Sequence, residues 1–285
     1  QYPGMGPVKV QFSLSVTDWG AGNTTDIVLE KGEDVEVELT DIEPGVDIAK
    51  ADLYLSSGEK VREVKNIVVK GNKMKFVFPR FEEGQGLQLD RAVFYTGDEE
   101  SFVYYFEDME LKGNNYDKVV LPAPKVGDAW AGGTIFLVGE VTGYDDGAGE
   151  FKTDTKGINA YRGRVVANES LGNLMWCKDK IPVGATDMND GNKNLETIQR
   201  YIEEHSTTLE IFPAFKACVE LGTGWYYPAI NEMKYIIAHK ENLGEGVNLG
   251  SKAYGSSTER GVDNLCVGTN ANKDSPVEVR PVRAY

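Results

Sequence analysis

The sequence contains few of the residues on which metal sites, disulfide frameworks and histidine-based catalysis depend. Its 285 residues include only three cysteines and two histidines. Three cysteines that lie far apart specify no disulfide framework, and two histidines leave little material for zinc binding or for a catalytic base. We expect Cys177, Cys218 and Cys266 to be small buried side chains. One disulfide with one free thiol is the alternative.

Clusters of basic residues and long apolar runs are also missing. The chain has 30 Lys and Arg against 45 Asp and Glu, a formal net charge of -15. Nucleic-acid binding depends on clustered Lys and Arg, so the sequence predicts no nucleic-acid partner. No stretch approaches the roughly 18 apolar residues of a membrane helix, so we predict no transmembrane segment. Because the sequence starts at Gln1, we expect a processed chain whose leader is not visible.

The composition predicts two folded domains. Hydrophobic residues make up 41% and aromatic residues 10% of the chain, which is enough for packed cores. Domains of roughly 150 residues predict two of them in a chain of this length. Leu121-Pro-Ala-Pro-Lys125 favours an extended connector, since proline cannot donate to a sheet ladder. We therefore predict a first domain over 1–121, a linker over 122–125 and a second domain over 126–285.

The first domain alternates apolar and polar residues with a period of two. Short alternating runs separated by turn signals such as Pro44-Gly45 predict an all-β sandwich, and one buried face per strand suits antiparallel sheets. The predicted strands are 8–16, 35–39, 52–55, 67–69, 74–78, 92–95, 102–106 and 119–121.

The second domain mixes short strands with helical periods, which predicts an α+β fold. Strands are expected at 133–139, 163–167 and 173–177. Leu195, Ile198 and Ile202 recur at helical spacing, so a helix is expected from about 194 to 205. A second helix is expected from Pro213 to 222, because proline suits a first helical turn. A third is expected from 228 or 231.

Several motifs of the second domain occur in an order typical of one family. After the opening Val126-Gly-Asp-Ala-Trp-Ala-Gly-Gly-Thr-Ile-Phe-Leu-Val138 come Asn189-Asp-Gly-Asn-Lys-Asn-Leu-Glu-Thr-Ile198, Gly224-Trp-Tyr-Tyr-Pro-Ala-Ile-Asn-Glu-Met233, Tyr254-Gly-Ser-Ser-Thr-Glu259 and Val279-Arg-Pro-Val-Arg-Ala-Tyr285. Together they resemble the family named for the C-terminal domain of a collagen-like adhesin of Legionella, in the formylglycine-generating-enzyme branch of the C-type-lectin fold. The resemblance implies a C-type-lectin-like fold over 126–285. Its structural signature residues here are Trp225, Pro228, Glu232, Ser257, Glu259, Arg280 and Arg283.

The first domain resembles another group of surface proteins. Val10-Gln-Phe-Ser-Leu-Ser-Val-Thr-Asp-Trp-Gly20 is similar to the N-terminal sandwich of fimbrillin-type pilins and related surface lipoproteins of the Bacteroides group. This implies a fimbrillin-like, transthyretin-like sandwich. It also implies a place at the cell surface or outer membrane of a Gram-negative bacterium, either lipid-anchored or fimbrial.

The sequence departs from the ligand-binding and catalytic patterns of the lectin-like fold. It has no Glu-Pro-Asn, Gln-Pro-Asp or Trp-Asn-Asp triplet for calcium-bridged sugar binding. Cys266 has no nearby second cysteine for the copper site of the formylglycine-generating enzymes. The stretches 145–147 and 187–191 have a calcium-loop composition without the calcium-loop spacing, so we expect turns there. We therefore predict no catalytic residue, no metal site and no cofactor.

Three signature residues have a structural and a functional interpretation. Trp225 is expected to pack in the core, with a sugar-stacking platform as the alternative. Arg280 and Arg283 are expected to pair with carboxylates such as Glu232 or Glu259, with an anionic ligand as the alternative. His239 lies at a predicted helix end, where its charge would complement the helix dipole, so no catalytic triad is predicted.

The segment 242–273 is the candidate recognition surface. Asn, Tyr and Arg in polar loops provide adaptable hydrogen bonds and rigid aromatic area. The alternative is that these loops are solvated turns. The candidate ligand-binding residues are Asn248, Tyr254, Arg260, Asn264, Asn270, Asn272 and Lys273.

The leading hypothesis is a non-catalytic adhesin at the cell surface or on a fimbria. It would bind a glycan or protein on a host or bacterial surface, and could pair with other pilus subunits by strand exchange. Because Tyr285 directly follows the last predicted strand, we expect a subunit that accepts a strand without donating one, as at a pilus tip. Alternatives are a lipid-anchored or secreted glycan-binding module for nutrient capture, an enzyme of the formylglycine-generating type, and a structural subunit without a ligand.

Overall fold

The computed structural model describes most of the chain. Described are residues 26–28, 35–40, 46–65, 67–71, 73–78, 87–97, 99–112, 119–121, 123–244, 246–250, 252–261, 263–267 and 269–285. The predicted strand 8–16 and the fimbrillin-like segment 10–20 lie outside these residues. The protein is rich in β-structure, and the described residues form three α-helices, which confirms a β-rich chain with a smaller α+β part.

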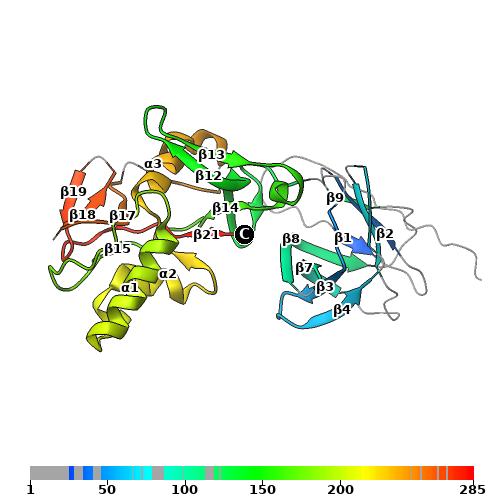
Figure 1. Cartoon of the computed structure of the whole chain (residues 1–285), viewed down its shortest axis with the longest axis horizontal. Coiled ribbons are helices and arrows are strands. Elements are labelled where there is room, and N and C mark those ends of the chain that lie inside the picture. Colours follow the sequence, from blue (N-terminus) through cyan, green and yellow to red (C-terminus); the bar gives the residue numbers. More distant parts are fainter. Residues whose placement is uncertain are drawn as a thin grey trace, which may run out of the picture. The chain divides into compact units, whose positions relative to one another are not determined.

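The chain divides into two compact units (Figure 1). Unit 1 comprises Gln1–Pro124 and the later segment Thr155–Arg162. Unit 2 comprises Lys125–Asp154 and Gly163–Tyr285. No hydrophobic period in the sequence predicts that residues 155–162 belong to unit 1.

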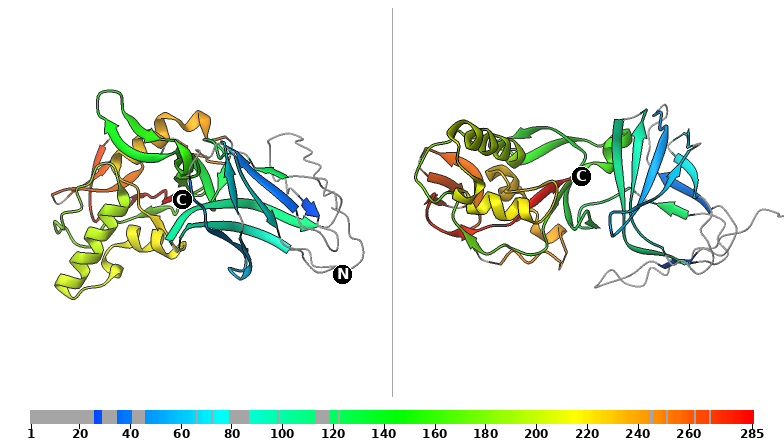
Figure 2. Two further views of the ribbon diagram at one scale, coloured as in Figure 1. Left: turned by 45° about the vertical axis from the view of Figure 1, so that its right-hand side comes forward. Right: turned by 90° about the horizontal axis from the view of Figure 1, so that it is seen from below.

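The described residues of unit 1 form two sheets. One has the strand order β1-β8-β7-β3-β4 and the other β5-β6-β2-β9. The strands are β1 Asp26–Val28, β2 Val35–Thr40, β3 Lys50–Leu55, β4 Lys60–Val64, β5 Val68–Lys70, β6 Lys73–Phe78, β7 Leu87–Thr96, β8 Glu99–Lys112 and β9 Val119–Leu121. Figure 2 shows the long strands β7 and β8 side by side.

Most neighbouring strands of unit 1 are antiparallel, as predicted. The exceptions are β1 with β8 and β2 with β9, which are parallel. For these two pairs the prediction of an antiparallel sheet is wrong, because alternation indicates which face of a strand is buried and carries no information on the direction of its neighbour. Strands β1 and β4 were not predicted from the sequence, and β4 is mostly exposed, so burial leaves little apolar pattern in it.

The core of unit 1 follows the period of two. On β8, Phe102, Tyr104 and Phe106 are buried. Phe94 of β7 stacks on Phe102 with ring centroids 4.6 Å apart. The later segment contributes Tyr161, whose side chain is fully buried with its ring 5.1 Å from that of Phe102. The Tyr161 hydroxyl donates to the Thr40 carbonyl, so this core is completed by a residue that follows it by many positions in the sequence.

Unit 2 is built on a five-stranded sheet with three helices. The main sheet has the order β10-β11-β14-β21-β16, and three smaller sheets pair β12 with β13, β15 with β20, and β17-β18-β19. The strands are β10 Ala129–Trp130, β11 Gly133–Val138, β12 Glu140–Asp145, β13 Glu150–Asp154, β14 Gly163–Val166, β15 Asn173–Leu174, β16 Trp225–Tyr226, β17 Gly255–Arg260, β18 Asp263–Cys266, β19 Thr269–Asn272, β20 Val277–Glu278 and β21 Val282–Ala284.

All three predicted helices are present. They are α1 Gly191–His205, α2 Pro213–Glu220 and α3 Ile230–Ala238. Helix α1 begins earlier than predicted because the Asp190 side chain caps it, accepting from the Asn192 amide at 3.0 Å. Helix α2 has proline in its first turn, as predicted. No helix in the described part of the chain has the length and apolar character to cross a membrane.

The core of unit 2 is aromatic. Trp176 is fully buried and meets Phe215 of α2 edge-on, with ring centroids 5.1 Å apart. The three cysteines are buried and form no disulfide, which confirms the prediction of small buried side chains, and the disulfide alternative is wrong. Helices α1 and α3 both pack against β17, so the small β17-β18-β19 sheet is attached directly to this core.

Candidate functional site

The small sheet presents a polar face. Arg260 at the end of β17 pairs with Asp263 of β18, which pairs with Asn272 of β19. Residues opposite one another on neighbouring strands project from the same face, and residues two apart on one strand share that face. Asn270 therefore projects with Asn272. Arg260, Asn270 and Asn272 are exposed and Asp263 is partly exposed; we call these four residues the polar face.

Two charged side chains of the polar face have no partner among the described residues. In the part of the chain that the structure describes, Arg260 and Asp263 make no ion pair or side-chain hydrogen bond, although their strands pair directly. A guanidinium only donates, a carboxylate only accepts, and the amide of Asn272 does both. The polar face therefore presents neighbouring hydrogen-bond donors and acceptors to a molecule outside the chain. In Figure 1 the sheet lies at one end of unit 2, on the side away from the C-terminus.

The opposite face of the sheet is buried and carries an ion pair. Lys273 Nζ lies 2.6 Å from Glu259 Oε2 and 2.6 Å from the Ile181 carbonyl oxygen. It also lies 4.3 Å from the ring centroid of Trp176, a cation–π contact. Lys273 has no exposed surface. Its assignment to an exposed binding loop is therefore wrong: Lys273 lies in the turn that follows β19, and its side chain is buried.

Tyr254 is also misplaced by the sequence analysis. Its side chain is 1% exposed and its hydroxyl donates to the Leu249 carbonyl at 2.8 Å. It packs as a core aromatic, so it is not part of an exposed surface. Asn248 is exposed, and its Oδ1 accepts from the Gly250 amide at 3.1 Å, which closes its own turn. Asn264 pairs with Glu259 and Ala271, in the register row next to that of Arg260.

The structure thus brings together Arg260, Asn270 and Asn272 from the seven predicted residues. Asp263 joins them and was missed by the sequence analysis, which treated the whole segment as loops. A signal was present: Gly261, which has a φ of 68°, marks a tight turn between Arg260 and Asp263. Positive φ is easily adopted by glycine and favours such hairpins.

The signature residues are structural. Trp225 is 7% exposed and pairs with Arg283 in the main sheet, as the core-packing interpretation predicts. Pro228 is buried, and its carbonyl accepts from the Ser257 amide at 2.7 Å. The Ser257 hydroxyl accepts from Asn194 Nδ2 of α1 at 2.8 Å. These contacts join the helices of unit 2 to β17.

The predicted partners of the two C-terminal arginines are wrong. Arg280 donates to the backbone carbonyls of Asn168 and Asn248. Arg283 Nη1 donates to the Ala131 carbonyl at 3.2 Å. The carboxylates expected to pair with them have other partners: Glu259 pairs with Lys273, and Glu232 pairs with Arg164 of β14.

Glu232 is the most completely bonded carboxylate of unit 2. It accepts from Arg164 Nη1 at 2.7 Å, the Tyr226 hydroxyl at 2.8 Å, and the amides of Ala229 at 2.7 Å and Gly191 at 2.9 Å. It is fully buried. Burial raises the pKa of Glu232, and the charge of Arg164 opposes that rise. A carboxylate with all these donors holds α1, α3 and β14 together and has no free lone pair for proton transfer.

The two acidic stretches form turns. Asp145 Oδ1 accepts from the amides of Gly147 at 3.1 Å and Ala148 at 3.2 Å, between β12 and β13. Asp187 Oδ1 accepts from the amides of Asn189 and Asp190, each at 2.8 Å. Among the described residues, no group of three or more His, Cys, Asp or Glu side chains is arranged to hold a metal ion.

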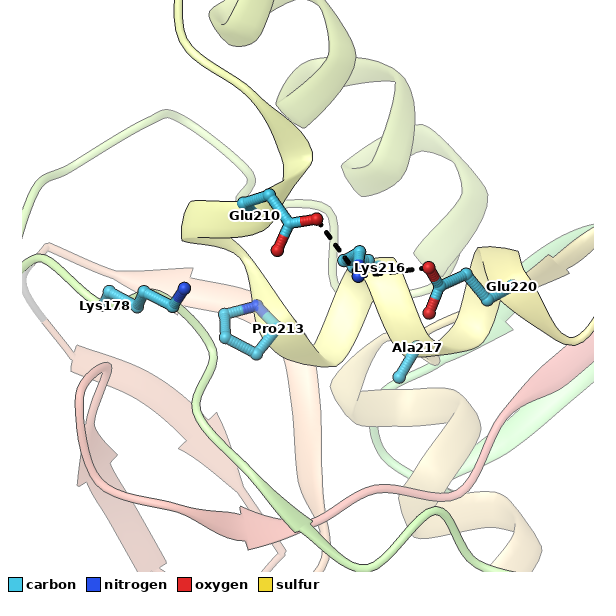
Figure 3. Close-up of a pocket in the computed structure, with 6 residues that line it drawn as sticks. All are labelled: Lys178, Glu210, Pro213, Lys216, Ala217 and Glu220. Atoms are coloured by element: carbon cyan, nitrogen blue, oxygen red, sulfur yellow. Dashed lines mark ion pairs between the residues drawn. The ribbon is translucent and has the colours of Figure 1, made fainter.

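A shallow pocket of about 240 Å³ lies beside α2 (Figure 3). Its most ordered feature is Lys216, which lies 3.1 Å from both Glu210 and Glu220. These two carboxylates raise the pKa of Lys216 through hydrogen bonds. Lys216 is therefore already paired within the chain, whereas Lys178 is exposed and makes no ion pair among the described residues. Lys178, Pro213 and Ala217 complete the lining.

Comparison with known protein families and with curated proteins finds no match for this chain.

Proposed function

We propose that the protein is a non-catalytic adhesin of the cell surface or a fimbria, in which unit 2 is a C-type-lectin-like head and the polar face is its binding surface. One observation carries this proposal: Arg260 and Asp263, which have no side-chain partner among the described residues, pair in register with each other and with Asn272 on the accessible face of the small sheet. The motif resemblances within 126–285 support the same assignment.

The chemistry of the polar face favours a ligand rich in hydroxyl groups. Each sugar hydroxyl both donates and accepts, so it can bond to a carboxylate and to a guanidinium or amide at neighbouring positions. The polar face also carries charges of both signs on directly paired residues, Arg260 and Asp263. We therefore propose a surface glycan as the partner, with a hydrophilic protein surface as the other class to test.

The thiols and hydroxyls of unit 2 support a binding role over an enzymatic one. Cys266 and Cys218 are buried, and burial raises the pKa of the Cys218 thiol far above its ordinary value, which removes the reactive thiolate. Thr258 Oγ1 donates to the Asp187 carbonyl at 2.8 Å and accepts from the Ile230 amide at 3.0 Å. A protein that used Cys266 as its reactive group would lose its activity in Cys266→Ser, whereas we expect this variant to bind as wild type does.

Unit 1 is proposed as the attachment unit, with a fimbrillin-like sandwich that joins the protein to the outer membrane or to a pilus. Its two sheets end in short strands: β1 and β9 each have one partner strand among the described residues. An edge strand has unpaired backbone donors and acceptors, which is what strand exchange with a pilus subunit requires. Lipid anchorage at the outer membrane is the alternative mode of attachment.

The test is a glycan and matrix-protein array probed with labelled full-length chain. The wild type is compared with the triple variant Arg260→Ala, Asp263→Ala, Asn272→Ala. A matched control carries Lys193→Ala, Glu196→Ala and Arg200→Ala, three exposed residues of α1. We expect binding by wild type and control, and at least a tenfold loss in the polar-face variant, as hydrogen-bonded charged contacts are worth about 1.5–3 kcal/mol each.

Three results would redirect this proposal. Equal binding by all three proteins would place the ligand elsewhere on the chain. Saturable binding of soluble oligosaccharide without adherence to cells that display it would favour nutrient capture over adhesion. Absence of binding by the wild type to every glycan and matrix protein on the array would remove the proposal.

A further inference from the structure

The strands that carry the polar face have little apolar sequence to fix their register. The sequence of β17 is Gly-Ser-Ser-Thr-Glu-Arg and that of β19 is Thr-Asn-Ala-Asn. Register is weakly specified in short polar strands, and a slip by one residue moves every side chain to the opposite face. Such a slip on β17 or β19 would turn Arg260 or Asn272 inward.

The ladder itself is interrupted just before the polar face. Between Gly255 and Glu259 the pairing of β17 with β18 shifts, and the regular pairing resumes at Glu259. The register at the Arg260 end is therefore not inherited from the first residues of β17. Ser257 and Thr258 tie β17 to α1 and α3, but its pairing with β18 resumes only at Glu259, the residue that carries the buried carboxylate.

The buried ion pair meets this requirement. Glu259 precedes Arg260, and Lys273 follows Asn272, so the pair lies on the buried face directly behind the outer strands of the polar face. Their 2.6 Å contact joins β17 to the end of β19 across β18. Glu259 also accepts from the amides of Val183 and Gly184, and Lys273 donates to the Ile181 carbonyl, which ties both strands to one segment of the chain.

An ion pair in this position is not needed for stability alone. Both side chains are almost fully withdrawn from water, with 0% and 3% of their surfaces exposed. Desolvation of two charges costs free energy that their attraction roughly offsets, and apolar side chains of similar volume are often as stable or more so. Apolar residues, however, would not favour one strand register over another. A charge pair with fixed hydrogen bonds can form in one register only, so it disfavours pairings shifted by a residue.

We propose that the Glu259–Lys273 pair is the positioning element of the binding face, fixing the register that holds Arg260, Asp263 and Asn272 in one exposed row. This inference rests on the proposed function for its biological meaning. Its physical content, the register of β17 and β19, is independent of any ligand. Glu259 and Lys273 themselves do not contact the ligand.

The experiment uses the full chain with Glu259→Leu and Lys273→Met combined. Amide hydrogen exchange followed by mass spectrometry is measured for peptides covering 255–273 and for peptides of α1 and α3. We expect at least tenfold faster exchange in 255–273, with α1 and α3 unchanged. On the glycan and matrix-protein array we expect at least a tenfold loss of binding although all four polar-face residues are intact.

A matched control removes a second ion pair of unit 2. Lys216 Nζ lies 3.1 Å from Glu220 Oε1 on α2, outside the small sheet, and the control is Lys216→Met with Glu220→Leu. It should leave exchange in 255–273 and array binding at wild-type levels. If the Glu259/Lys273 double variant fails to fold, Glu259→Gln is measured in its place, because it keeps the shape of the side chain and removes its charge.

The outcomes separate this inference from the proposed function. Wild-type exchange in 255–273 in the folded double variant, or in Glu259→Gln, would overturn the inference whatever the ligand. Faster exchange with binding retained would also overturn the inference, since binding by the polar face would then not depend on the register of β17 and β19. If the wild type binds nothing on the array, the proposed function fails, and the exchange data alone decide whether the pair sets the register.

Discussion

Both units have apolar cores, but unit 2 in addition joins its elements through buried ion pairs and hydrogen bonds. In unit 1, apolar and aromatic side chains alternate along paired strands, and Phe94 stacks on Phe102 across them. In unit 2, helices and short strands are joined by buried polar groups, above all the Arg164–Glu232 pair. Apolar packing tolerates many neighbours of similar size, whereas a buried carboxylate requires its donors at fixed positions. Unit 2 is therefore the unit whose geometry is most narrowly specified.

The largest expected effect comes from breaking the pair at Glu232. Glu232→Gln leaves the Arg164 guanidinium buried without its counter-charge, and removing one partner of a buried pair costs about 4 kcal/mol. Because Trp130, Trp176 and Trp225 all belong to unit 2, denaturant unfolding followed by tryptophan fluorescence reports on this loss. Glu203→Gln, an exposed change on α1, should have no effect. Equal stability of the two variants would show that Glu232 does not hold unit 2 together.

A substitution that creates a cavity in the core of unit 1 should lower the free energy of unfolding by slightly less. Leu53 of β3 is fully buried, and Leu53→Ala is expected to cost about 3 kcal/mol through lost burial and an unfilled cavity. Hydrogen exchange of β3 and β7 peptides measures this loss of stability. The matched control is Val68→Ala, at a residue that is 55% exposed. Wild-type protection of β3 in Leu53→Ala would contradict the apolar account of unit 1.

A pH-dependent effect is expected at Glu278. Burial raises the pKa of Glu278, but the hydrogen bonds from Lys252 and Ser170 outweigh it and leave the pKa below its ordinary value of 4.5. A carboxylate whose pKa is lowered in the folded state stabilises the protein above its unfolded pKa, and the stabilisation is lost as the pH falls through the folded pKa. Glu278→Gln should therefore cost about 2 kcal/mol at pH 7.

The check is the pH profile of that difference. Stability of wild type and Glu278→Gln is compared from pH 7 downward, and the two curves should converge once the pH falls below the folded pKa of Glu278. A constant difference over the whole range would show that the charge of Glu278 contributes nothing.

The smallest expected effect is the loss of a helix cap. Asp190→Ala removes the side-chain acceptor for the Asn192 amide at the start of α1, which typically costs about 1 kcal/mol. Faster amide exchange confined to the first turn of α1 is the expected observation. Asp146→Ala in the β12–β13 turn serves as the control. If Asp190→Ala changed amide exchange in that turn and left the first turn of α1 unchanged, the prediction would be contradicted.

The comparison also explains what the sequence could predict. Alternation located the strand around Phe102 and helical spacing located α1 through Leu195 and Ile198, because burial of one face leaves a periodic pattern. The pairing of Glu232 with Arg164, and of Glu259 with Lys273, was not predicted. A polar residue that finds a partner far away in the sequence leaves no periodic trace.

The candidate site shows the same limit. Asn and Arg residues pointed to the segment 242–273, and three of them share the polar face. The face itself depends on strand register, which decides that Asn272 is exposed while Lys273 is buried. Composition cannot separate two neighbouring polar residues on this basis, so Lys273 and Tyr254 were assigned to the surface and Asp263 was missed.

The most direct test of the binding face is chemical protection of Arg260. The full chain is modified with phenylglyoxal, free and bound to the array ligand that gives the strongest signal, and arginine-containing peptides are quantified by mass spectrometry. Our account predicts that Arg260 is protected in the complex, while Arg200 of α1 and Arg62 of unit 1 are modified at unchanged rates. Unchanged modification of Arg260 together with protection of either of the other two would contradict it.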